Sequence, residues 1–108
     1  MITKTLITTK TFWSNFTLEY DRGDMDWAFD RIKSTTKGNK TTLELDNEYV
    51  CTDQNNTDLT PYSWFIGIMK SDIDPFGWVL DNYDEGDAAE KAKDRAYIAG
   101  CKKILQQL

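Results

Sequence analysis

The sequence predicts an α+β domain: an antiparallel sheet of about four to six strands with two helices packed on one face, the second of them a long C-terminal helix. Strand-like and helix-like patterns follow one another in the order strands, helix, strands, helix. This order lacks the regular alternation of strand and helix that is typical of parallel α/β folds. The 108 residues suffice for one domain, residues 1–108, and a composition of 40% hydrophobic and 29% charged residues is globular.

The first twenty residues have the composition of strands. Threonines and aromatic residues dominate, and both are favoured on a pleated surface. From Phe12 onward the hydrophobic residues alternate, because one face of the predicted strand carries Phe12, Phe16, Leu18 and Tyr20, whereas Trp13 lies on the other. We therefore predict strand structure as far as Tyr20.

A first helix is predicted after a turn at residues 21–23. Asp24 is a suitable residue to cap its start. Hydrophobic residues then fall at i, i+3, i+4 and i+7, as on one side of a helix: Met25, Ala28, Phe29 and Ile32. Gly38 provides the expected stop signal.

The chain is predicted to return to strands after Gly38. Leu43 and Leu45 alternate with polar residues, which indicates a strand with one buried face. Asp46-Asn47 has the composition of a two-residue turn, so residues 48–52 are expected to run back antiparallel.

Residues 53–80 complete the predicted sheet. The polar residues 53–61 form the expected loop. Residues 62–69 are apolar on both alternating faces, as in a central strand that is covered on both sides. A turn over residues 71–75 is then expected to lead into a last strand over residues 76–80.

The C-terminal helix has the strongest pattern in the sequence. Asp84 or Asp87 caps its start, and Glu90 stands three residues after Asp87, in capping-box spacing. Two adjoining stripes follow at helical spacing, one of alanines and one of larger residues: Ala89, Ala92, Ala96 and Ala99, then Tyr97, Cys101, Ile104 and Leu108.

The residues that usually carry catalysis are scarce. The chain contains no histidine, which removes the usual general base and the commonest metal ligand. It has no Walker A loop and no GxGxxG motif, and Cys51 and Cys101 stand apart from any CxxC spacing. Asp72 and Asp74 form the best carboxylate pair for a magnesium ion, although a solvated polar turn is the favoured interpretation. We therefore predict no enzymatic activity, no cofactor and no metal ion.

The sequence also lacks the patterns of membrane insertion and export. Its longest uncharged run is too short and too interrupted to cross a bilayer. Residues 1–5 do not begin a basic region followed by an apolar stretch, as a signal peptide does. We expect a cytoplasmic protein, located in the host cytoplasm if a phage encodes it, with no membrane partner.

The charge is distributed unevenly along the chain. The formal net charge is −5, but residues 41–90 contain twelve acids and only one base, Lys70, so this block carries −11. Such a block repels nucleic acid and attracts basic partners. Seven aromatic residues lie in the same block, and aromatic residues often anchor protein interfaces. The alternative is that the aromatics fill the core and the acids only maintain solubility.

These features favour a small acidic, DNA-mimicking inhibitor that binds a basic nucleic-acid-handling protein, such as a nuclease, without contacting nucleic acid itself. Phage or bacterial proteins that block restriction enzymes or CRISPR effectors, and immunity proteins paired with nuclease toxins, have this character. The residues predicted to bind the partner are eight acids and two tryptophan anchors: Glu44, Asp46, Glu48, Asp72, Asp74, Asp81, Asp84, Glu85, Trp64 and Trp78.

Two other classes of function remain open. Residues 87–96, Asp-Ala-Ala-Glu-Lys-Ala-Lys-Asp-Arg-Ala, resemble the last helix of double-stranded RNA-binding domains. That resemblance implies nucleic-acid binding through Lys91 and Lys93 at the start of a basic C-terminal helix. The third class is a self-associating structural protein or homodimer, with Trp13 exposed on a strand beside Thr11 and Thr17.

Overall fold

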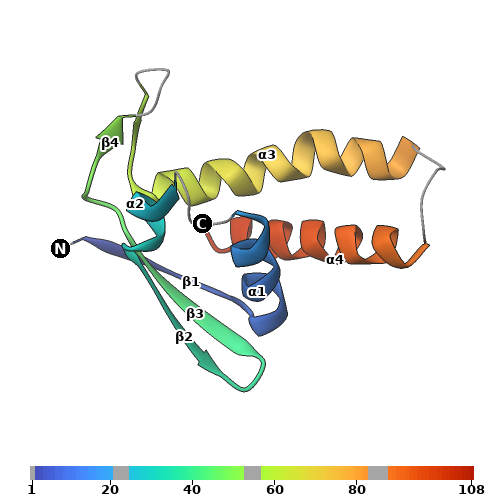
Figure 1. The fold of residues 1–108 in the computed structure, drawn as a ribbon, viewed down its shortest axis with the longest axis horizontal. Helices are drawn as coiled ribbons and strands as arrows, with labels where there is room; N and C mark the ends of the chain where they lie inside the picture. The colour runs from blue at the N-terminus through green and yellow to red at the C-terminus, as the bar shows by residue number, and fades with distance from the viewer. Residues whose placement is uncertain (1, 21–24, 53–56, 83–87) are drawn as a thin grey trace.

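The chain folds into an α+β structure with four helices, a three-stranded sheet and a two-stranded sheet among its described residues (Figure 1). The computed structural model describes residues 2–20, 25–52, 57–82 and 88–108, with the backbone alone for residues 74–82. The elements follow in the order β1 (Thr3–Thr9), α1 (Lys10–Glu19), α2 (Asp26–Phe29), β2 (Ile32–Lys37), β3 (Lys40–Asp46), β4 (Cys51–Thr52), β5 (Asp58–Leu59), α3 (Pro61–Asn82) and α4 (Ala88–Leu105).

The main sheet is antiparallel, with β3 between β1 and β2. Leu43 is paired with Leu6 of β1, so that two leucines lie on the same face of the sheet. Lys37 pairs with Lys40, and the two residues between them form the turn of the β2–β3 hairpin. Gly38 has a φ of 62° in this turn, a backbone conformation that glycine adopts without steric cost. The antiparallel α+β class is thus confirmed, with fewer strands than predicted.

The core lies between one face of the main sheet and helices α1, α3 and α4. Leu43 of the sheet, Phe16 of α1, Phe65 and Met69 of α3 and Ile104 of α4 are all fully buried. The opposite face of the sheet is exposed, and threonines, lysines and glutamates lie along it. The hydrophobic effect therefore fixes the three helices to a single side of the sheet.

The outer edge of β1 is joined to the C-terminal end of the chain. The side-chain amide of Gln107 donates from Nε2 to the Ile7 carbonyl at 2.6 Å, and its Oε1 accepts from the Ile7 backbone N–H at 2.8 Å. One side chain thus satisfies the two backbone groups that an adjacent strand would otherwise pair.

The prediction of a strand up to Tyr20 is wrong beyond Thr9, because residues 10–19 form α1. Phe12 and Phe16 are four residues apart, a spacing that places both on one face of a strand and also on one face of a helix. The Thr9 side chain decides between them, since its hydroxyl accepts a hydrogen bond from the Phe12 N–H at 3.0 Å and caps the helix. Trp13 is accordingly half-buried on a helix, packed against Phe16 and Phe65, instead of exposed on a strand.

The predicted strands over 62–69 and 76–80, and the turn between them, are also wrong, because one long helix, α3, spans Pro61–Asn82. The start of α3 has a reciprocal cap: the Ser63 N–H donates to Thr60 Oγ1 at 3.1 Å, and the Thr60 N–H donates to Ser63 Oγ at 2.8 Å. Pro61 occupies the first helical position, where its missing N–H costs nothing.

The helix predicted from Asp24 is much shorter than expected. Only Asp26–Phe29 form α2, after which the chain enters β2 at Ile32. Ala28 and Phe29 are buried as the hydrophobic stripe predicts, but the run Ser34-Thr35-Thr36 favours a strand. Gly38 consequently serves a hairpin turn and does not end a helix.

The expected hairpin at Asp46-Asn47 does not form either. The Asp46 carboxylate instead accepts hydrogen bonds from the backbone N–H groups of Glu48, at 2.7 Å, and Tyr49, at 3.0 Å. This side-chain turn ends β3. Cys51–Thr52, the end of the predicted strand 48–52, instead pair with Asp58–Leu59, which lie in the segment that was expected to be a loop.

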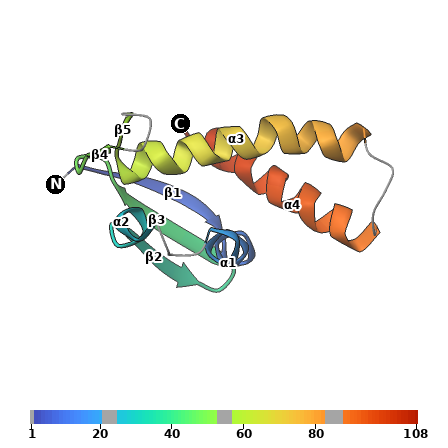
Figure 2. The same ribbon diagram turned by 45° about the horizontal axis from the view of Figure 1, so that its top comes forward.

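Helices α3 and α4 pack against each other as a hairpin. In Figure 1 and Figure 2 the end of α3 and the start of α4 extend past the sheet and past α1. The predicted long C-terminal helix is confirmed as α4, although Asp84 and Asp87, its expected caps, lie outside the described residues. Within the described chain no helix is sufficiently long and apolar to cross a membrane.

Candidate partner-binding site

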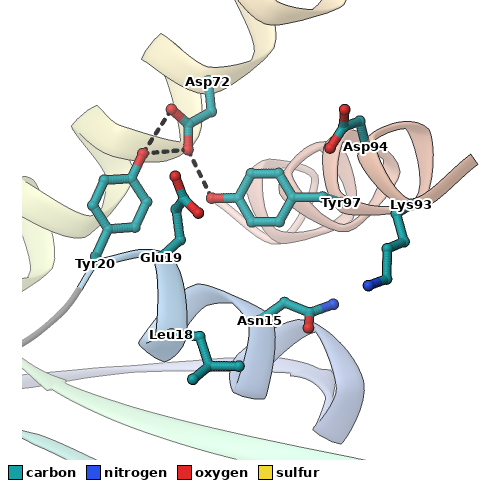
Figure 3. Close-up of a pocket in the computed structure, with 8 residues that line it drawn as sticks. All are labelled: Asn15, Leu18, Glu19, Tyr20, Asp72, Lys93, Asp94 and Tyr97. Atoms are coloured by element: carbon teal, nitrogen blue, oxygen red, sulfur yellow. Dashed lines mark hydrogen bonds between the residues drawn. The ribbon is translucent and has the colours of Figure 1, made fainter. Parts of the chain in front are cut away.

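A carboxylate and two tyrosines join three helices at the centre of the α3–α4 hairpin (Figure 3). Asp72 belongs to α3, Tyr97 to α4, and Tyr20 is the residue that ends α1. The Tyr20 hydroxyl lies 2.8 Å from Oδ1 and 2.7 Å from Oδ2 of Asp72, and the Tyr97 hydroxyl donates to Oδ2 at 2.7 Å. Hydrogen bonds to an ionised acceptor are stronger than those between neutral groups. The three residues therefore fix α1 and α4 to α3.

Burial and the Asp72 carboxylate keep both tyrosines protonated. Burial is the larger cause that raises the pKa of Tyr20 and of Tyr97, and the hydrogen bond to Asp72 raises each pKa further. Burial also raises the pKa of the Cys101 thiol, one helical turn after Tyr97, to about 12. At neutral pH these groups are donors and not proton acceptors, which is unsuited to acid–base catalysis near pH 7.

A cavity of about 320 Å³ opens beside this network, between α1, α3 and α4. Ligand pockets commonly begin at this size. Helix α1 contributes three lining residues and its C-cap, Tyr20, a fourth; α3 contributes one and α4 three. The eight residues are Asn15, Leu18, Glu19, Tyr20, Asp72, Lys93, Asp94 and Tyr97 (Figure 3).

The lining of the cavity is predominantly acidic. Three carboxylates, from Glu19, Asp72 and Asp94, stand against one ammonium group, that of Lys93. Within the described chain, the Glu19 and Asp94 carboxylates form neither a hydrogen bond nor an ion pair, whereas Asp72 is held by the two tyrosines. The cavity is therefore suited to a positively charged group.

Three of the acids predicted to bind the partner lie on and beside the end of β3, away from the cavity. Glu44 is on the exposed sheet face, where its carboxylate lies 3.9 Å from the Lys33 ammonium. Asp46 is only 8% exposed, and the backbone N–H groups that it accepts from lower the pKa of its carboxyl. Glu48 is exposed and accepts from the backbone N–H of Ile2 at 3.1 Å. Asp46 thus has a structural role in the turn.

The predicted residues of the helical hairpin have mixed outcomes. Trp64 is only 6% exposed and packs edge-on against Phe16 and Phe29, so it belongs to the core and is not available as an anchor in this conformation. Asp72 lines the cavity. The structure does not describe the side chains of the remaining five predicted residues. Asp74, Trp78 and Asp81 belong to α3 by their backbone, and Asp84 and Glu85 lie outside the described residues.

Six residues of the site were not predicted from the sequence: Asn15, Leu18, Glu19, Tyr20, Asp94 and Tyr97. Tyr97 was assigned to the hydrophobic stripe of the C-terminal helix, and Tyr20 to a strand. The positions of Tyr20 and Asp72 differ by 52 and those of Asp72 and Tyr97 by 25, so no local pattern reports their contact. The one available signal is a hydroxyl-bearing residue within an apolar helical stripe, which needs a polar partner when it is buried.

The two lysines singled out for RNA binding do not share one environment. Lys93 lines the acidic cavity beside Asp94, and Lys91 is half-buried. Among the described residues, no three acidic, cysteine or histidine side chains gather closely enough to hold a metal ion.

No family model, no curated protein and no solved structure matches this chain. Any function must therefore be argued from the arrangement of its own residues.

Proposed function

We propose that this chain is a small binding protein that captures a basic nucleic-acid-handling protein through its α3–α4 hairpin, as an inhibitor of the anti-restriction, anti-CRISPR or immunity type. One observation carries the proposal. Residues 71–90 contain seven acids and no base, and within this segment the end of α3, up to Asn82, and the start of α4, from Ala88, extend past the sheet (Figures 1 and 2).

An acidic projection of this kind has a defined electrostatic effect. Seven like charges on a short stretch create a negative potential that concentrates basic partners and speeds their encounter. The same potential repels nucleic acid, which makes direct binding of a phosphate backbone unfavourable. The cavity beside the hairpin adds the carboxylates of Glu19, on α1, and Asp94, on α4, which have no hydrogen-bond or ion-pair partner among the described residues.

The rest of the molecule supports the hairpin as a rigid element. The buried residues of α3 and α4, Phe65, Met69, Cys101 and Ile104, anchor both helices in the core. Asp72 and Tyr97 join the helices through a 2.7 Å hydrogen bond. A pre-ordered surface loses less conformational entropy on binding than a flexible one. This supports a binding role for the part of the hairpin that these contacts hold in place.

The test compares two triple variants that change the net charge equally. One neutralises the hairpin with Asp74→Asn, Asp81→Asn and Asp84→Asn, and the control neutralises acids elsewhere with Asp26→Asn, Glu44→Gln and Asp58→Asn. Wild type and both variants are immobilised and used to capture proteins from lysate of bacterial cells at low and high salt, with mass spectrometry.

The proposal predicts that one basic nucleic-acid-binding protein is retained by wild type and by the control, and that high salt or the hairpin variant releases it. Retention of the same protein by all three forms would contradict the assignment to the hairpin. Recovery of nucleic acid in place of a basic protein would contradict the proposed function.

A further inference from the structure

The cavity between α1, α3 and α4 has rigid aromatic walls. The Tyr20 and Tyr97 hydroxyls are both bound to Asp72. The Tyr97 ring also stacks on Phe12 with 5.1 Å between ring centroids, and the Tyr20 ring packs on Phe16 with 4.9 Å. Each tyrosine is thus held at its hydroxyl end and along its ring. The walls are formed before any ligand arrives, which reduces the entropic cost of binding.

The carboxylates of the cavity stand on separate walls. Glu19 belongs to α1, Asp72 to α3 and Asp94 to α4; in Figure 3 the Glu19 carboxylate is drawn beside that of Asp72, and Asp94 is drawn apart from both on α4. Neither Glu19 nor Asp94 has a hydrogen-bond or ion-pair partner within the described chain. Among the described lining residues Lys93 is the one base, and its side chain is exposed, so it can turn toward solvent when another cation enters.

We propose that this cavity binds the guanidinium group of an arginine side chain supplied by the basic partner, an inference that rests on the proposed function. A guanidinium group is planar, carries several N–H donors in fixed directions and stacks on aromatic faces. It can therefore contact a tyrosine ring while donating to the carboxylates of Glu19 and Asp94, which stand on separate walls. The ammonium group of lysine is a compact charge that cannot use the two walls and the ring in this way.

The direct test uses N-acetyl-arginine amide as a small probe and follows the protein by ¹H–¹⁵N NMR. The proposal predicts saturable shifts of the backbone signals of Glu19, Asp94 and Tyr97. N-acetyl-citrulline amide has nearly the same shape without the charge. It should bind at least about tenfold more weakly, because hydrogen bonds that involve a charged group are stronger than those between neutral groups. Equal shifts with both probes, or shifts confined to other regions, would overturn the proposal.

Two double variants with equal charge change provide the matched comparison. Glu19→Gln with Asp94→Asn removes the unpaired carboxylates of the cavity, and Asp26→Asn with Glu44→Gln removes two acids elsewhere. The cavity variant should bind the arginine probe about tenfold more weakly than wild type, and the control should bind it as wild type does. Equal affinity of the two variants would overturn the cavity assignment.

The same variants separate this proposal from the proposed function. If the cavity variant still captures the basic partner as wild type does, while the hairpin variant loses it, the proposed function stands and the arginine pocket is wrong. If no form captures a basic protein but the probe still enters the cavity of the wild type alone, the cavity is a cation site and the proposed function is wrong.

Discussion

The Tyr97 hydroxyl donates a hydrogen bond to Asp72 Oδ2 across a distance of 2.7 Å, and this bond joins α3 and α4 about half way along each helix. Tyr20 binds the same carboxylate from α1. One acid thus holds together the three helices that surround the cavity. Asp72 was predicted to bind a partner, but its position gives it a structural role.

Removing the Tyr97 hydroxyl should lower stability. Tyr97→Phe keeps the ring that stacks on Phe12 but removes the donor to Asp72, so we expect the free energy of unfolding to fall by about 1.5 kcal/mol. Asp72→Asn should cost more, because both tyrosines lose a charged acceptor. Urea denaturation measures both values. Tyr62→Phe, at a half-buried tyrosine on α3, is the control and should change stability by less than about 0.5 kcal/mol.

Stability should decline in alkaline solution for an identifiable reason. The folded state raises the pKa of Tyr20 and Tyr97 above the ordinary 10.0, and raises that of Cys101 from 9.0 to about 12. Above those ordinary values the unfolded chain loses protons that the folded chain retains, so the free energy of unfolding decreases as pH rises. Well below the ordinary 9.0 of the Cys101 thiol, these three groups are protonated in both states and cause no such decline.

Urea denaturation between pH 7 and about pH 11 tests this dependence. The double variant Tyr20→Phe with Tyr97→Phe should be less stable than wild type at neutral pH but should lose less further stability at alkaline pH. Parallel curves for the two proteins would show that the tyrosine pair does not cause the alkaline decline.

Because α4 closely approaches α1 at Gly100, a larger residue at this position should lower the stability of the fold. A Cβ at Gly100 would overlap Cδ2 of the buried Phe12 ring and lie 2.8 Å from its Cε2. We expect Gly100→Ala to destabilise the fold by about 1 to 3 kcal/mol, the usual cost of overpacking. Gly67→Ala is the matched control, because a Cβ there meets nothing within 4 Å. It lies inside α3, so we expect thermal unfolding to show a gain of about 0.5 to 1 kcal/mol.

The contact of Gln107 with β1 should protect one specific backbone amide. Gln107→Ala removes both hydrogen bonds to Ile7, so the Ile7 amide should exchange with deuterium faster, with a loss of stability of about 0.5 to 1 kcal/mol. Gln106→Ala changes the neighbouring exposed glutamine and should leave Ile7 exchange as in wild type. Unchanged exchange in the Gln107 variant would mean that α4 shields the strand edge by other means.

The hydrophobic pattern predicted the buried residues better than it predicted the secondary structure to which they belong. Phe12, Phe16, Phe65 and Met69 are all in the core, although each was assigned to a strand and lies on a helix. Short aromatic-rich runs fit both the helical and the strand period, so the capping residues decide which element forms. Thr9, and Thr60 followed by Pro61, are the sequence signals that favour helices over the strands that the hydrophobic alternation predicts.

The site was beyond sequence reasoning for a different reason. Charge counting identified Asp72 as one acid among many, but the contact with Tyr20 and Tyr97 depends on how three helices pack, and their positions in the chain are far apart. The sequence likewise left open whether the acids of the block share one face. Glu44 and Asp46 belong to strand β3 of the sheet, whereas Asp72 belongs to helix α3 of the hairpin. The acids of the block therefore do not form one surface.

The most direct test of the central claim, that the α3–α4 hairpin is the binding surface, is hydrogen–deuterium exchange of the chain with and without its captured basic partner. We predict that the partner slows exchange in residues 65–100 and leaves the exchange rates of the exposed strand β2 unchanged. Slower exchange confined to β2 and β3, with the hairpin unaffected, would contradict it.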